Sequence, residues 1–433
     1  GTTGGGKSTT VAGLVARARA AGMAVIVLDV EGEYTCLHEP TDHKPMLAGL
    51  AARGLRPEGV PAKAMTVYHL QGRGTANPDH PNRRPFSLQF ARLSPYAVME
   101  VLDLSDGQQE RFLKVYDVAK LLLRDLGRFP EKNQPEQEQL AMEIDEFERG
   151  YPRVTLPLLI DLVRACAQRA ESKTDKKRGK KSEDDEADAA PAFEPQCREL
   201  LADGALAHLN KRLHAANPPT NVVSWHALQG KLSRFNRLRV FFDETTEGVR
   251  PLPYSRLIKP GALSIIDLSD TGFSELNNFA IADVLRGLQE AQDEAVEKAA
   301  EEKRPPTPVL IVVEEAHEFL SEERIARTPV LFEQVAKICK RGRKRWLGLC
   351  FVTQLPAHLP KQVLGLCNSF ILHKLQDPHV VSLLRRTVGG VDEGLWNRLP
   401  NLAPGQAVVS FPHFARPLLV SIDSSQAKLK MTE

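Results

Sequence analysis

The sequence predicts an α/β protein whose mostly parallel, doubly wound sheet is interrupted by a helical insertion. Two observations lead to this prediction. Short apolar runs such as Met23–Leu28 and Val309–Val313 have the length and composition of strands that are buried on both faces. Stretches with apolar residues at three- and four-residue spacing alternate with such runs, which is typical of helices that connect parallel strands.

The first element is a glycine-rich stretch, Gly1-Thr-Thr-Gly-Gly-Gly-Lys-Ser-Thr9, which fits the phosphate-binding pattern G-x-x-x-x-G-K-[ST]. Small residues let consecutive backbone N–H groups turn inward around a phosphate. A lysine at this position can reach the β- and γ-phosphates, and the following hydroxyl can ligate Mg²⁺. An amphipathic helix that ends at Gly22 should follow. A flexible glycine-rich terminus would explain neither the Lys-Ser pair nor this helix. The predicted nucleotide-binding residues are Gly1, Gly4, Gly5, Gly6, Lys7, Ser8 and Thr9.

A phosphate-binding loop normally follows a buried strand, and no strand precedes Gly1. We therefore expect the sequence to be a piece whose first strand, and anything upstream of it, is absent.

Composition limits the class of protein. The 433 residues are 42% hydrophobic and 26% charged, which suits two or three domains. The net charge of +2 gives no nucleic-acid signal for the whole chain, so any DNA site would have to be a local basic surface. Six cysteines form no C-x-x-C pair, which favours free thiols in a reducing cytoplasm over disulfides or zinc. No apolar run is long enough to cross a membrane.

The first core segment, residues 1–85, continues with a strand over Met23–Asp29. The acidic turn Asp29–Tyr34 follows at the edge of the sheet where ligands bind in parallel α/β folds. Its acids Asp29, Glu31 and Glu33 can meet Mg²⁺, water or a neighbouring subunit, or they can form a solvated turn. A second strand is expected over Ala64–Leu70, and Gln71–Pro85 reads as a polar loop.

Residues 86–250 read as a helical insertion. Within it, Glu171–Ala190 is a basic block followed by an acidic block without large apolar residues, so we expect a disordered linker there. Its basic half can touch DNA, although a solvated loop fits better. The second core segment, residues 251–433, resumes the α/β pattern. Its expected strands are Leu263–Leu268, Pro308–Glu315, Leu347–Gln354 and Ser369–Gln376, followed by a hairpin of Gln406–Phe411 and Pro417–Ile422.

Paired acids end one of these strands. Glu314 and Glu315 follow the apolar run that begins at Val309, in the manner of a Walker B strand. The first acid can hold Mg²⁺ directly or through water, and the second can orient or deprotonate the attacking water. An ordinary buried strand with an acidic exit is the alternative, and Lys7 in the same chain favours the active-site interpretation.

Two further features lie near the next strand. Gln354 ends it, where a polar side chain can sense the γ-phosphate. The basic run Lys340–Arg345 precedes it and can stabilise transition-state charge across a subunit boundary, contact DNA phosphates, or form a solvated helix end. No guanine-reading N-K-x-D motif is present, which favours ATP over GTP.

The ordered motifs together resemble one family, the HerA-type ATPases of the FtsK–HerA superfamily. The resemblance covers most of residues 1–125 and 260–425 and is weak over 126–250. It is carried by Gly1–Thr9, Asp29–Tyr34 (DVEGEY), Val312–Phe319 (VVEEAHEF), Gly342–Gln354 (GRKRWLGLCFVTQ) and Leu366–Leu375 (LCNSFILHKL).

This resemblance implies a RecA-like P-loop core in a hexameric ring that uses ATP and Mg²⁺ to move double-stranded DNA. It also implies a NurA-like nuclease partner in DNA-end processing, or another effector in antiphage defence. We expect the family's N-terminal β-barrel to lie outside this sequence. A conjugation-type or secretion ATPase at a membrane, and a nucleotide-dependent scaffold for an effector, are the alternatives. The implied roles are phosphate contact for Lys7, Mg²⁺ contact for Ser8 and Glu314, catalysis for Glu315, sensing for Gln354 and an arginine finger at Arg343 or Arg341.

Overall fold

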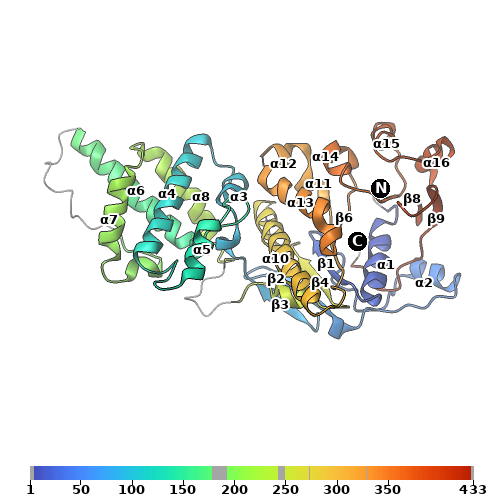
Figure 1. Cartoon of the computed structure of the whole chain (residues 1–433). Coiled ribbons are helices and arrows are strands. Elements are labelled where there is room, and N and C mark those ends of the chain that lie inside the picture. Colours follow the sequence, from blue (N-terminus) through green and yellow to red (C-terminus); the bar gives the residue numbers. More distant parts are fainter. Residues whose placement is uncertain (1–3, 178–192, 242–248, 273, 328, 431–433) are drawn as a thin grey trace. The chain divides into compact units, whose positions relative to one another are not determined.

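The computed structural model describes residues 4–177, 193–241, 249–272, 274–327 and 329–430 (Figure 1). The chain divides into two compact units, each with most of its contacts within itself. Unit 1 comprises Gly1–Phe86 and Leu252–Glu433, and unit 2 comprises Ser87–Pro251. The sequence places the corresponding segment boundaries at residues 85/86 and 250/251. Within the described ranges, no helix has both the length and the apolar character that a membrane crossing requires.

A six-stranded sheet forms the centre of unit 1. Its strand order is β3-β2-β4-β1-β5-β6, and every neighbouring pair is parallel, which confirms the predicted doubly wound α/β fold. All six residues of β1 are buried, as expected for a strand that is covered on both faces. The strands are β1 Ala24–Asp29, β2 Met65–Leu70, β3 Arg83–Phe86, β4 Leu263–Asp267, β5 Val309–Val313 and β6 Leu347–Phe351.

Strand β3 lies within the stretch that the sequence predicted to be a polar loop. Its first three residues, Arg83, Arg84 and Pro85, are exposed, and among the described strands it pairs with β2 alone. Proline and charged residues are tolerated on an edge strand because one side of its backbone needs no partner. The polar composition therefore hid a genuine strand.

Helices cover both faces of this sheet, and Figure 1 shows α1 on one side of the strands and α10 on the other. Val11 and Val15 of α1 pack in one buried cluster with Val25 and Val27 of β1. The alternate residues of β1 point to the opposite face. The helices of unit 1 are α1 Lys7–Ala20, α2 Lys44–Ala51, α9 Tyr254–Leu257, α10 Ser274–Glu301, α11 Ala316–Leu320, α12 Glu322–Arg327, α13 Pro329–Arg345, α14 Lys361–Leu364, α15 Pro378–Arg385 and α16 Glu393–Arg398.

A second, antiparallel sheet follows the main one along the chain. It contains β7 Phe370–Leu372, β8 Gln406–Ser410 and β9 Leu418–Ser421 in that order. The predicted hairpin is confirmed as β8–β9. Of the strand expected over Ser369–Gln376, only Phe370–Leu372 forms a strand, β7, and it pairs with β8 rather than with the parallel sheet. A small core of its own lies beside this sheet and includes Trp396 and Leu399.

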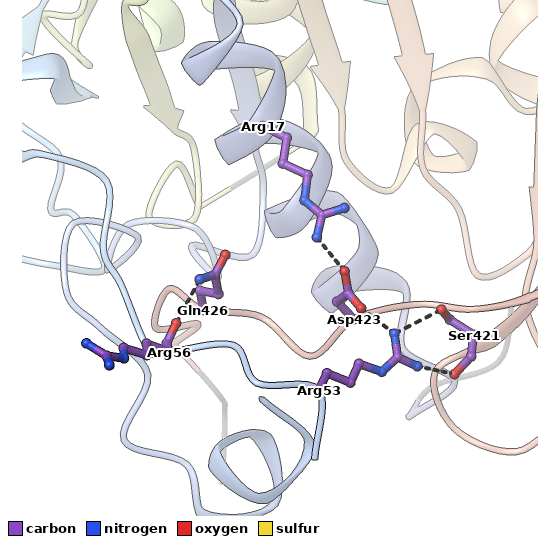
Figure 2. Close-up of polar contacts among 6 residues, drawn as sticks. All are labelled: Arg17, Arg53, Arg56, Ser421, Asp423 and Gln426. Atoms are coloured by element: carbon purple, nitrogen blue, oxygen red, sulfur yellow. Dashed lines mark hydrogen bonds and ion pairs between the residues drawn. The ribbon is translucent and has the colours of Figure 1, made fainter. Parts of the chain in front are cut away.

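The C-terminal segment, residues 421–430, is held against the first helices of unit 1. Asp423 accepts hydrogen bonds from Arg17 of α1 and from Arg53, just beyond α2 (Figure 2). Further along, the Gln426 amide donates to the carbonyl of Arg56 at 2.7 Å. The end of the chain is thus tied to the helix that follows the glycine loop.

Unit 2 is helical, with α3 Pro95–Val101, α4 Asp106–Asp125, α5 Pro135–Glu143, α6 Leu156–Lys177, α7 Ala205–Ala216 and α8 Val222–Asn236. Helix α6 packs against α4 and α8. It continues through Lys177, so the first seven residues of the expected linker Glu171–Ala190 are helical and that part of the prediction is wrong. No glycine or proline interrupts these residues, and Glu171 contacts His226 of α8 at 2.9 Å. Residues 178–190 lie outside the described ranges.

Candidate active site

Three glycines stand directly before α1. Gly4 and Gly6 have φ angles of 73° and 96°, in the left-handed region that glycine enters without strain. Gly6 precedes Lys7, the first residue of α1, and as the N-cap residue it has no side chain to cap this helix. The backbone N–H groups of the first turn can therefore bind an anion. Gly5 lies between the two, and Gly1 falls outside the described residues.

The first turn of α1 carries Lys7, Ser8 and Thr9, all partly exposed. Burial raises the pKa of the Glu31 carboxyl, Glu315 raises it further, and Lys7 opposes the shift. These three side chains therefore lie close enough to interact. Glu31, which the sequence left open between a site residue and a solvated acid, belongs to the same edge of the sheet as Lys7 and Glu315.

Asp29 ends β1 and organises the turn that follows. Its carboxylate accepts backbone hydrogen bonds from Gly32 at 2.7 Å, from Glu33 at 3.2 Å and from Tyr34 at 2.9 Å. Burial raises its pKa to about 7, although the bond from the Tyr34 N–H opposes the shift. These contacts give Asp29 a structural role, because they hold the turn that brings Glu31 and Tyr34 to the site.

Glu314 follows β5 and is 3% exposed. The Tyr34 hydroxyl donates to its Oε1 at 3.0 Å, whereas its Oε2 is buried and has no hydrogen-bond partner among the described residues. Burial raises the pKa of Glu314 to about 8. A buried carboxylate oxygen without a partner is costly unless a cation, a water molecule or a proton satisfies it. The sequence did not assign any role to Tyr34, and only its place in the DVEGEY motif could have suggested one.

Glu315 adopts a left-handed backbone conformation, with φ 43° and ψ 48°, at the start of α11. A non-glycine residue held there is unusual, and such residues cluster at functional sites. Its Oε2 accepts from the Gln354 backbone N–H at 3.3 Å and lies 3.1 Å from Nδ1 of His317. The structure therefore brings Gln354 beside Glu315 through its backbone. His317, in turn 3.2 Å from Thr353 Oγ1, was missed by the sequence reasoning.

Arg341 and Arg343 lie elsewhere. Both are exposed in the last turns of α13, and Gly342 between them packs against Leu347, the first residue of β6. Leu347 is paired with Val309, the first residue of β5. Both arginines are therefore at the amino ends of the strands, whereas Glu314 and Glu315 follow the carboxyl end of β5.

The residues present fit a nucleotide with Mg²⁺. Gly4–Gly6 and the uncapped start of α1 form an anion cradle. Ser8 and the unpartnered Oε2 of Glu314 are the oxygen ligands that a hard cation prefers. Among the described residues, no group of three or more His, Cys, Asp or Glu side chains is placed to hold a metal.

Comparison with curated proteins identifies relatives of part of the chain. It is 27% identical to the DNA double-strand break repair helicase HerA of Sulfolobus acidocaldarius over 172 residues, which are 40% of this chain and 34% of that protein. A probable DNA double-strand break repair helicase HerA of Methanocaldococcus jannaschii is 34% identical over 118 residues, 27% of this chain and 22% of that protein. The chain thus spans about a third or less of these relatives.

Among solved structures, VirB4 of Thermoanaerobacter pseudethanolicus shares the fold. The superposition covers 98% of this chain and 88% of that one, with a TM-score of 0.50 and 15% identity. The family described as "Helicase HerA, central domain" matches residues 1–287, about two thirds of the chain and including Gly4–Lys7. The glycine loop, the parallel sheet and this match together place the chain in the HerA helicase central-domain family.

Proposed function

We propose that this chain is the motor core of an ATP-hydrolysing DNA translocase. The observation that supports the proposal most strongly is the meeting of two elements at one edge of the sheet. Lys7, at the N-terminus of α1, and Glu315, directly after β5, both interact with Glu31. Phosphoryl transfer to water requires a phosphate-binding turn with a cation, here Lys7, beside a carboxylate of fixed orientation, here Glu315.

Each site residue has a proposed role. Gly4–Gly6 and Thr9 contact the phosphates through their backbone, and Lys7 neutralises the β- and γ-phosphates. Ser8 and Glu314 hold the bound Mg²⁺, which neutralises charge on the phosphate oxygens. Glu315 accepts the proton of the attacking water, and the contacts of its Oε2 with His317 and the Gln354 N–H fix its orientation. The Gln354 side chain senses the γ-phosphate.

Completion of the site by a second subunit is part of the proposal. Arg343, or Arg341 in its place, projects from the amino ends of the strands, and we propose that it reaches the nucleotide of a neighbour in a hexameric ring. An arginine supplied in this way contributes about a thousandfold or more to hydrolysis. These arginines lie at the amino ends of the strands, whereas the chain's own glycine loop lies at the carboxyl ends. This separation supports the idea, because an arginine so placed can act on the nucleotide of another subunit rather than on its own.

The wider assignment rests on the family. We propose double-stranded DNA as the substrate, a cytoplasmic location, and a NurA-like nuclease or another effector as the partner, in DNA repair or antiphage defence. Helicases named for DNA double-strand break repair among the relatives support the DNA substrate. We also propose that residues 86–250 are an insertion into the ATPase core, which the return of the chain to the parallel sheet through β4 supports.

A steady-state ATPase assay with and without double-stranded DNA tests the function. The wild-type chain should hydrolyse ATP faster when DNA is added. Lys7→Ala should weaken ATP binding, whereas Glu315→Gln should bind ATP and lose turnover. Hydrolysis that is slow and indifferent to DNA would instead favour a nucleotide-dependent scaffold. Failure of the wild-type chain to bind ATP would overturn the proposal.

A further inference from the structure

A buried histidine outside the expected site touches the helix that follows the glycine loop. His373 follows β7 and is 3% exposed. Its Nε2 lies 2.9 Å from Oγ1 of Thr10, in α1, and its Nδ1 lies 3.1 Å from the carbonyl oxygen of Gln406, in β8. The Thr10 hydroxyl is also 2.9 Å from the carbonyl of Gly6. One imidazole thus connects the antiparallel sheet to the last glycine of the loop through a single hydroxyl.

The charge state of His373 follows from its surroundings. Burial is the main cause that lowers its pKa to about 4; Lys7 contributes to this fall, and hydrogen bonds to the backbone of Gln406 and Gly5 oppose it, so the ring is neutral at physiological pH. A carbonyl oxygen can only accept a hydrogen bond. We therefore assign the single ring proton to Nδ1, which donates to Gln406, and Nε2 then shares the one proton of the Thr10 hydroxyl with the carbonyl oxygen of Gly6 in a three-centre hydrogen bond. The neutral ring places no second positive charge beside Lys7.

A second contact joins the same two elements. The backbone N–H of Gly405, just before β8, lies 3.4 Å from the carbonyl oxygen of Gly5. A Cβ atom at Gly6 would meet Gly405 N at 3.1 Å and Gly405 Cα at 3.3 Å. The loop before β8 therefore packs so closely against the glycine loop that a Cβ atom at Gly6 would need the Gly405 backbone to move by a few tenths of an ångström. The Gly405 backbone thus contacts Gly5, and the His373 side chain reaches the adjacent Gly6 through Thr10.

We propose that His373 is a positioning residue for nucleotide binding, which holds the glycine loop in its phosphate-binding shape through Thr10 and Gly6. This inference rests on the proposed function, because the loop must bind phosphate for its shape to matter. His373 does not touch the nucleotide. It fixes the start of α1, whose N–H groups form the cradle, and thereby removes the need to order the loop when ATP binds.

A purely structural role for His373 makes a different prediction. A histidine that only stabilises the fold would, when removed, reduce the folded fraction, which lowers apparent kcat and leaves KM unchanged. Loss of a preorganised loop instead weakens ATP binding in every folded molecule. The KM for ATP and the Kd of a nonhydrolysable ATP analogue should then rise together, while kcat per folded molecule stays close to that of the wild type.

The experiment compares His373→Ala, His373→Gln and Thr10→Val, each made in the whole chain described here, with His379→Ala. His379 is an exposed histidine of α15, and its variant serves as the matched control. One uncharged hydrogen bond corresponds to about a threefold to tenfold change in affinity. We expect His373→Ala and Thr10→Val to raise Kd and KM by that factor. The double variant should show no further loss, because both residues act through one contact. Gln can accept from Thr10 through its amide oxygen, so His373→Gln should recover most of the affinity.

Two results would overturn the inference. One is a His373→Ala protein that binds the ATP analogue as tightly as the wild type. The other is a folded His373→Gln protein that is as weak as His373→Ala, because the Thr10 contact would then not matter. A wild-type chain that binds no ATP would refute the proposed function itself. Unchanged ATP affinity in the His379→Ala control shows that a loss in His373→Ala is not a general effect of removing a histidine.

Discussion

The carboxyl ends and the amino ends of the strands in the parallel sheet differ in burial and in charge. We call these the carboxyl edge and the amino edge of the sheet. At the carboxyl edge, Glu314 and Glu315 are buried, and their oxygens are held by Tyr34 and by the backbone of Gln354. At the amino edge, the last turn of α13 exposes a run of cations that includes Arg343 and Lys344. The carboxyl ends of the strands thus carry the groups that we propose bind the nucleotide, whereas the last turn of α13, at the amino ends, presents exposed positive charge.

This difference shows why closeness in sequence misleads here. Arg343 and Glu315 belong to the same strand-helix-strand unit, yet β6 alone, with five residues, spans about 15 Å between the two edges. Helix α13 runs back along the sheet, so its end is carried away from the chain's own glycine loop. A role for Arg343 in hydrolysis therefore requires the nucleotide of another subunit.

Removing Arg343 should have the largest effect on hydrolysis. Arg343→Ala should lower kcat by about a thousandfold or more, since an arginine finger stabilises charge only in the transition state. ATP binding and assembly, measured by analogue binding and light scattering, should remain. Lys344→Ala, in the same exposed turn, is the matched control and should have little effect. A large loss with Arg341→Ala but not Arg343→Ala would move the finger to Arg341, and unchanged basal activity in both would exclude a finger in this turn.

Glu315→Gln should lower kcat by about a hundredfold to ten-thousandfold, the usual contribution of a positioned general base. The amide keeps the size of the side chain and loses its ability to take a proton. ATP affinity, measured by calorimetry, should change little. Wild-type turnover in this variant would mean that another group activates water, and Glu31 would be the first candidate because it interacts with both Glu315 and Lys7.

Tyr34→Phe should destabilise the nucleotide-free protein by about 1–3 kcal/mol, because it leaves Oε1 of Glu314 buried without its donor. Urea unfolding measures this change. Tyr96→Phe, at a partly exposed tyrosine of unit 2 whose ring stacks on Phe147, is the control and should be nearly neutral. Equal stability of the two variants would show that the hydroxyl does not support Glu314.

The smallest effect concerns pH. The pKa of His373 is about 4 in the folded protein and ordinarily 6.5, so between these values the unfolded chain binds a proton that the folded chain does not. Stability is therefore lost as pH falls from 6.5 towards 4. Between pH 7 and pH 5, the wild type should lose on the order of 1 kcal/mol more than His373→Gln. If the urea midpoints of the two proteins fell by the same amount between pH 7 and pH 5, this result would contradict the assignment of a neutral, buried His373.

Much of the fold and part of the site could be predicted from the sequence. The apolar runs that became β1, β4, β5 and β6 are continuous because parallel strands are buried on both faces. Edge strand β3 carries Arg83, Arg84 and Pro85 and gave no such signal. Lys7 and Glu315 belong to local motifs. Tyr34, His317 and His373 contribute through contacts across the fold, such as the one between His373 and Thr10, 363 positions away, which no local pattern encodes.

Co-assembly of two inactive variants tests most directly whether Lys7 of one subunit and Arg343 of its neighbour form one site. Co-expressed in equal amounts, Lys7→Ala and Arg343→Ala should form mixed rings in which about a quarter of the interfaces pair an intact Lys7 with an intact Arg343. ATPase activity should then recover to about that fraction of the wild-type rate, while each variant alone stays inactive. Mixed rings, verified by two affinity tags, that remain as inactive as either parent would contradict the account.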